Sequence, residues 1–203
     1  FGSLVGFTAF NWLLRNTRER ILAQVRFAPG ALEKVRRHQP AVMLSAHLGN
    51  WELVAQGGVA HGIPILCVAK QIGSPAMTAL LTKQRALIGQ EIIPIEGAVR
   101  QLIRTLKGGT SVGLLVDQHM DLSEGGTTCT FFGRPVSVAM TPATLSRKLN
   151  VPILFVWARP LKNACYHIEC SDIFLPDPNI TDAARTQQLS DAIERVVRRH
   201  PSF

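Results

Sequence analysis

The segment AVMLSAHLGNWELVAQGGVA (residues 41–60) contains, in order, a run of small and apolar residues, a turn and the beginning of a helix. Residues 41–46 lack the polar alternation of a half-exposed strand and are typical of a strand that is buried on both faces. Gly49 allows a tight bend, and Asn50 is a favourable N-cap for a helix over residues 50–61. A buried strand that turns at once into a helix predicts an α/β fold.

The alternation of strands and helices continues along the rest of the chain. Helices are predicted over residues 75–89, which begin with Pro75, and over residues 98–107 and 182–199. Further segments with the length and apolar content of buried strands are 63–69, 91–95, 111–116, 134–138, 151–158 and 165–170. Together with residues 41–46, they predict an α/β fold with a mixed sheet of about seven strands, flanked by helices.

Two of these helices have a distinct apolar face. Apolar residues recur at helical spacing in both, and in 98–107 the opposite face carries cations. The residues predicted to face the core are Val99, Leu102, Ile103 and Leu106 in the first helix and Leu189, Ile193, Val196 and Val197 in the second.

Length and composition favour one globular domain with an N-terminal extension. The 203 residues are 46% hydrophobic and 18% charged, which excludes a disordered chain. Residues 1–40 are expected to form a helical arm, and residues 41–203 the folded domain. The arm begins with fourteen residues free of charge (1–14) and has seven Arg or Lys against two Glu, so it suits a membrane surface. A solvated helical face explains the same composition.

The formal charge of +8 favours anionic partners, namely nucleic acid, anionic lipid or acidic proteins. Against a nucleic-acid-binding domain stand the 6% aromatic residues, with a single Tyr, and the absence of a recognisable binding motif. The four cysteines form no CxxC pair, and their spread predicts reduced, buried thiols in a cytosol-facing protein. Cys67 is expected to lie in the core.

His47 and Glu52 are the first candidates for catalysis. Five positions apart on one helix they would diverge, but a histidine in the turn and an acid in the first helical turn can meet. A carboxylate on one ring nitrogen would leave the other nitrogen free to accept a proton, as in a general base with its orienting partner. The spacing equally fits a hydrogen-bonded turn histidine and an acid that the helix dipole favours.

The segment SAHLGNWEL (45–53) resembles the HxxxxE box of the late lipid A acyltransferases, within the wider lysophospholipid acyltransferase-like group. The similarity continues in order along residues 41–203. The segments that carry it are VAK (68–70), Arg85 with Gly89, GLLVDQ (113–118), FFGRPVSV (131–138), TPATLSRKLNVPILFVWARP (141–160) and IERVVRRHPSF (193–203). The order and spacing of these segments are more specific than any one of them.

This resemblance implies a glycerolipid acyltransferase-like fold and an enzyme at the cytoplasmic face of the bacterial inner membrane. It would transfer a fatty acyl chain from acyl carrier protein to a hydroxyl of a lipid A precursor, with His47 as the base and Glu52 as its partner. No cofactor or metal is implied, and the chain lacks both the GxSxG elbow and the HExxH box. Another lysophospholipid or glycolipid could be the acceptor, and an inactive lipid-binding homologue is a further alternative.

Other residues in the matching segments are candidates for substrate binding, although each polar one also fits an exposed loop or helix position. Phe131 and Phe132 fit the wall of an acyl groove or ordinary core and surface cover. His61, His119 and His167 match no motif and are expected to be structural or exposed. The predicted substrate-binding residues are Asn50, Lys70, Arg85, Asp117, Gln118 and Arg134.

Overall fold

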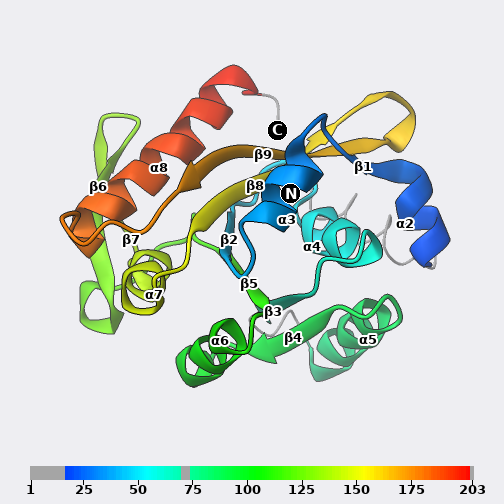
Figure 1. Cartoon of the computed structure of the whole chain (residues 1–203), viewed down its shortest axis with the longest axis horizontal. Helices are drawn as coiled ribbons and strands as arrows, with labels where there is room; N and C mark the ends of the chain where they lie inside the picture. Colours follow the sequence, from blue (N-terminus) through cyan, green and yellow to red (C-terminus); the bar gives the residue numbers. More distant parts are fainter. Residues whose placement is uncertain (1–16, 70–73, 202–203) are drawn as a thin grey trace.

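A computed structural model describes residues 17–69 and 74–201. Its main feature is a seven-stranded sheet with the strand order β1-β9-β8-β2-β5-β3-β4 (Figure 1). All neighbouring strands are parallel except β8 and β9, so the sheet is mixed and the predicted fold is confirmed. The strands are β1 (Val25–Phe27), β2 (Val42–Ser45), β3 (Ile65–Ala69), β4 (Glu91–Pro94), β5 (Ser111–Leu115), β8 (Ile153–Pro160) and β9 (Tyr166–Phe174).

Helices cover both faces of the sheet, which is why β2 is buried along its whole length. On one face Met43 of β2 packs in a cluster with Val54 of α4. On the other face Leu44 packs in a cluster with Leu102 of α6. The helices are α2 (Arg18–Gln24), α3 (Ala31–Arg37) and α4 (Trp51–Ala60), then α5 (Pro75–Ala86) beside β4, then α6 (Ala98–Lys107), α7 (Thr141–Leu149) and α8 (Asp182–Arg199).

The predicted inward faces of α6 and α8 are confirmed with one exception. Leu102 and Leu106 of α6 and Leu189, Ile193 and Val196 of α8 are buried, while Ile103 and Val197 pack against the core from partly buried positions. Val99 is 53% exposed, so its assignment to the inward stripe was wrong. The buried stripe of α6 begins at Ala98 instead, one position earlier, and this rotates Val99 outward.

The predicted strand at 134–138 forms, but outside the main sheet. It is β7 (Arg134–Ala139), and it pairs with β6 (Gly126–Phe131) in a separate two-stranded hairpin that lies against α8 (Figure 1). The two turn residues, Phe132 and Gly133, both have positive φ, as in the tight turns that join antiparallel strands. This turn folds β7 back on β6, and the seventh place in the main sheet is taken by β1.

The part of the N-terminal extension that the structure describes is not wholly helical. After α2 the chain enters β1, which pairs in parallel with β9, and α3 follows. Residues 1–16, which contain the whole uncharged opening segment, lie outside the described residues. Within residues 17–69 and 74–201, no helix is long and apolar enough to cross a bilayer. The role of residues 1–40 at a membrane surface stays a prediction.

Candidate functional site

His47 lies in the turn between β2 and α4, at the carboxyl edge of the sheet. The amide of Leu48 donates to the carbonyl of Ala46 at 2.7 Å, so the chain bends immediately after the strand. Gly49 has a φ of +56°, and its backbone is so close to the carbonyl oxygen of Ala158 on β8 that a Cβ there would collide with it. The side chain of Asn50 then accepts from the amide of Leu53 and begins α4, as predicted.

Asp117 is the hydrogen-bond partner of the His47 ring. Its Oδ1 lies 2.8 Å from Nδ1 of His47, and its Oδ2 accepts from the backbone amide of His47, also at 2.8 Å. The two meet because β2 and β5 are parallel neighbours, with Ser45 level with Leu115, so both chains leave the sheet at the same edge. The imidazole and carboxylate side chains are 34% and 25% exposed, so both are partly open to solvent.

The protonation state of the pair follows from the carboxylate. Burial alone would raise the pKa of Asp117, but hydrogen bonds from the ring and the amide of His47, together with the charge of the ring, outweigh it and hold that pKa below its usual value. An ionised carboxylate only accepts, so Nδ1 of His47 carries the hydrogen between them. In the neutral ring Nε2 is then the nitrogen that can accept a proton.

Glu52 points elsewhere. Its side chain is 4% exposed, and its two oxygens accept from Nε and Nη2 of Arg85 at 2.6 and 2.9 Å. Gln56, one turn further along α4, donates to Oε1 at 3.2 Å. The expectation that Glu52 reaches back to the imidazole is therefore replaced by a pairing with Arg85. The reason is geometric: the second residue of α4 faces the sheet and α5, while His47 projects outward from the turn.

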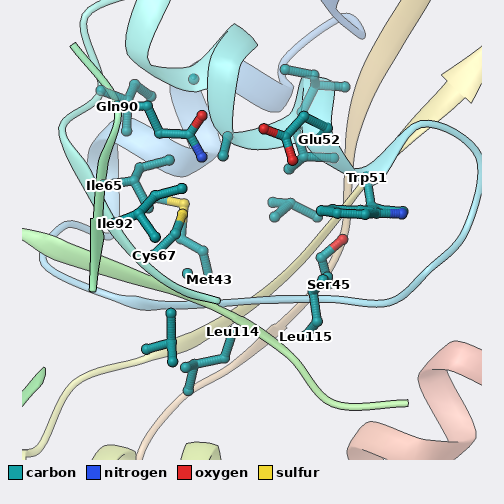
Figure 2. A pocket seen from close by; sticks show the side chains of 18 of the residues that line it. Met43, Ser45, Trp51, Glu52, Ile65, Cys67, Gln90, Ile92, Leu114 and Leu115 are labelled. Atoms are coloured by element: carbon teal, nitrogen blue, oxygen red, sulfur yellow. The ribbon is translucent and has the colours of Figure 1, made fainter. Parts of the chain in front are cut away.

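Beside the Glu52–Arg85 pair is a mostly apolar cavity of about 70 Å³, which we name the α4 pocket (Figure 2). Ser45 and Trp51 lie on one side of it, and Cys67 and Gln90 on the other. Its lining further includes Met43, Glu52, Val54, Ile63, Ile65, Val68, Ala69, Arg85, Ile92, Gly113, Leu114 and Leu115. The ring of Trp51 meets the imidazole of His47 edge-on, with 5.2 Å between centroids, so this pocket adjoins the histidine.

A second hollow, of about 390 Å³, lies between β7, α8 and the chain that follows β5; we name it the hairpin pocket. Asp117, Gln118 and His119 line its polar side, and Phe131, Val136 and Leu189 are among its apolar residues. Since the α4 pocket includes Trp51 and the hairpin pocket includes Asp117, and His47 contacts both residues, the imidazole lies between the two pockets.

The other predicted substrate-binding residues are dispersed. Asn50 is 8% exposed and serves as the helix cap. Arg85 is 5% exposed and would contact a ligand only inside the α4 pocket. Gln118 lines the hairpin pocket and would contact a ligand there. Arg134 is exposed at the turn of the β6–β7 hairpin. Lys70 lies outside the described residues.

The two phenylalanines and the three other histidines considered from the sequence lie in different surroundings. Phe131 lines the hairpin pocket, whereas Phe132 is 41% exposed beneath the guanidinium of Arg198. As predicted, the remaining histidines are structural or exposed. His61 bonds the carbonyl of Gly57 within α4 and packs on Phe27, His119 is exposed beside Asp121, and His167 contacts Arg159.

The four cysteines are free thiols. Cys67 lies in the wall of the α4 pocket, and burial raises its pKa to about 12, so it remains a neutral thiol.

Trp51 and Gln56 were not predicted as part of the site. The sequence signal that could have identified them is their position in the first two turns of a capped helix that begins beside His47.

The chain is similar to known acyltransferases. A family model described as bacterial lipid A biosynthesis acyltransferase matches residues 7–202. Two curated relatives, both phosphatidylinositol mannoside acyltransferases of Mycobacterium tuberculosis (strains CDC 1551/Oshkosh and ATCC 25618/H37Rv), are each 25% identical over 118 residues. Each alignment covers 56% of this chain but 37% of the relative, so the chain matches little more than a third of their length.

Proposed function

Because the chain belongs to the bacterial lipid A biosynthesis acyltransferase family, we propose that it transfers a fatty acyl chain from a thioester to a lipid hydroxyl, with His47 as general base. The observation that carries this proposal is the hydrogen bond of 2.8 Å between Nδ1 of His47 and Asp117. It fixes the tautomer that leaves Nε2 ready for a proton, on a side chain that is partly open between two pockets.

The proposed reaction has two proton transfers. Nε2 of His47 removes the proton from the acceptor hydroxyl as its oxygen attacks the thioester carbonyl. The tetrahedral intermediate then breaks its carbon–sulfur bond, and the imidazolium returns the proton to the departing thiol, which leaves an ester. The negative charge of Asp117 stabilises the imidazolium between these steps. The first turn of α4 begins at Trp51, next to the ring, and its positive end favours the developing oxyanion.

Glu52 has a positioning role in this proposal. Its ion pair with Arg85 joins the first turn of α4 to α5 and forms one wall of the α4 pocket. The carboxylate that acts directly on the base is Asp117. Both carboxylates support the site, but through different partners.

The α4 pocket is the proposed site of the acyl chain, because most of its lining is apolar and it adjoins His47 through Trp51. Acyl carrier protein is the proposed donor, and the formal charge of +8 suits an acidic carrier. The steps above need proton transfer and oxyanion stabilisation but no cofactor or metal.

A glycolipid is the proposed acceptor, bound in the hairpin pocket beside Asp117 and Gln118. Two names support this class: the family is named for lipid A, and the relatives are named for phosphatidylinositol mannoside. A lipid A precursor is the first choice and another glycolipid or a lysophospholipid the alternative. Both the anionic acceptor and the net charge suit the cytoplasmic face of the bacterial inner membrane.

The experiment is an acyl-transfer assay with acyl carrier protein thioesters and three acceptors: a lipid A precursor, a phosphatidylinositol mannoside and a lysophospholipid. Product masses identify the acceptor that is used. His47→Ala should abolish transfer, while His38→Ala, a histidine on the C-terminal end of α3 that bonds the carbonyl of Lys34, should leave it unchanged. Full activity in a folded His47→Ala variant would overturn the mechanism. Absence of transfer to all three lipids by the unaltered chain would overturn the function.

A further inference from the structure

The α4 pocket runs along the strands from the carboxyl edge of the sheet toward the opposite edge. The strand registers place its lining residues in successive cross-strand rows on one face. From the His47 end inward, these rows are Ser45 with Leu115, then Met43 with Gly113, Cys67 and Ile92, then Ile65 with Gln90. Gln90 belongs to the last row because the next residue, Glu91, pairs with Leu66.

Gln90 is the polar residue at the inner end. Its side chain is directed into the pocket from the side opposite Trp51 and Ser45 (Figure 2). The residue is 6% exposed, yet its Oε1 has no hydrogen-bond partner among the described residues. A buried amide carbonyl without a partner is unfavourable unless a water or a ligand group satisfies it. Ile65, the other lining residue of the last row, is apolar.

We propose that Gln90 closes the inner end of the α4 pocket and limits the length of the acyl chain that the pocket accepts. The inference rests on the proposed function, since it assigns the pocket to the acyl chain. A chain that fits within the pocket stops short of the amide. A longer chain would push its terminal methyl against this buried polar group, with which a methyl forms no hydrogen bond.

The strand geometry gives the approximate length of the part of the pocket that the sheet lines. Ser111 pairs with Ile65 and is level with Ala41, so four residues of β2 separate the row of Gln90 from Ser45, where the strand ends. At about 3.3 Å per residue this is about 13 Å. A van der Waals contact with Gln90 takes about 4 Å of that distance. With bonds of about 1.5 Å and angles near 111°, each methylene advances about 1.25 Å, so about seven carbons fill the rest.

Gly113 offers an independent change halfway along the pocket. A Cβ at this position would lie 2.9 Å from the sulfur of Cys67 and 3.2 Å from Cγ2 of Ile65, so Gly113→Ala would narrow the middle row. It should therefore shorten the accepted chain, whereas Gln90→Ala should lengthen it. Gln90→Leu is the matched control, because it keeps most of the bulk of the glutamine and removes the amide.

The test measures binding first, so that it does not depend on catalysis. Straight-chain fatty acids of graded length displace a fluorescent fatty acid from the purified chain and from each variant. The unaltered chain should lose affinity at least tenfold beyond a limiting length. Gln90→Ala should move that limit by two or more carbons toward longer chains, and Gly113→Ala toward shorter ones. Gln90→Leu should keep the steric limit but reduce the tenfold loss, because no amide is left unpaired.

The same series of lengths as acyl carrier protein thioesters then gives kcat/KM for transfer. If transfer occurs but the limiting length is the same in the unaltered chain and in folded Gln90→Ala, this inference fails while the proposed function stands. If fatty acids bind with a limit that moves as described but no lipid is acylated, the pocket assignment stands and the proposed function fails. A Gln90→Ala variant that does not fold leaves Gly113→Ala to decide, and an unchanged limit there also overturns the inference.

Discussion

Replacing Glu52 by Gln removes one charge from the buried pair with Arg85 and keeps the shape of the side chain. The carboxylate and the guanidinium side chains are 4% and 6% exposed, so water compensates little for the lost charge. The variant retains an amide oxygen that can accept from Arg85, but it leaves a buried cation without its counter-charge.

The magnitude follows from the geometry of the pair. The nitrogen–oxygen distances of 2.6 and 2.9 Å place the charge centres about 4 Å apart, where unit charges attract by about 4 kcal/mol at an effective dielectric constant near 20. Loss of one partner of a buried ion pair costs about 3–5 kcal/mol. We therefore expect Glu52→Gln to lower the free energy of unfolding by about 3 kcal/mol, since one hydrogen bond survives.

The assay is urea denaturation followed by circular dichroism, applied as a double-mutant cycle. Glu52→Gln combined with Arg85→Met removes both charges and should recover most of the loss, which gives a coupling energy of about 2 kcal/mol or more. The reasoning would be refuted if Glu52→Gln cost less than about 1 kcal/mol, or if the double variant were no more stable than Glu52→Gln alone.

Three other predictions concern the turn at Gly49, the pair formed by His47 and Asp117, and the start of α8. Gly49→Ala should destabilise the fold by about 3 kcal/mol in the same urea titration, because the added carbon collides with Ala158 and φ is +56°. Gly62→Ala is the control: φ is +80° but no atom lies within 4 Å of the added carbon, so it should cost about 1 kcal/mol. Equal losses in the two variants would contradict this. The lowered pKa of Asp117 means that its ionised form stabilises the fold above the unfolded pKa of about 3.9, and that this stability is lost as the pH falls through the lower folded value. The difference in unfolding free energy between the unaltered chain and Asp117→Asn should thus shrink as the pH falls below about 4; a difference that stays the same below that pH would oppose it. Asp182→Asn weakens the bidentate pair with Arg147, at 2.7 and 3.0 Å, and should cost about 1 kcal/mol by thermal denaturation, because the guanidinium is half-exposed; a loss above about 3 kcal/mol would contradict that estimate.

The strands and helices around the site were predictable because their signals are local. Residues 41–46 are small or apolar, and the structure buries β2 between helices on both faces. Asn50 caps α4, and Thr181 caps α8, as their residue types predict. The strand β1 escaped prediction because Val25–Phe27 is only three residues long at the edge of the sheet, where it pairs with one neighbour.

The partners within the site could not be derived from spacing. Glu52 is five positions from His47, and this suggested a local pair, but Arg85 lies 33 residues beyond Glu52 on α5 and takes its carboxylate. Asp117 lies 70 residues beyond His47 and reaches it because β5 is the neighbour of β2. Strand order decides that contact, and a single sequence does not reveal strand order. The sequence indicated that Asp117 follows a buried strand, but not which histidine it would meet.

The most direct test of the central claim is the rate of acyl transfer by Asp117→Asn, measured as kcat/KM with an acyl carrier protein thioester and the accepted lipid, beside unaltered protein. If Asp117 fixes the tautomer of the catalytic base, the variant should lose about 10²–10⁴ in rate while its circular dichroism spectrum is unchanged. A folded Asp117→Asn variant that transfers acyl chains within a few-fold of the normal rate would show that the pair formed by His47 and Asp117 is not the catalytic base and its orienting group.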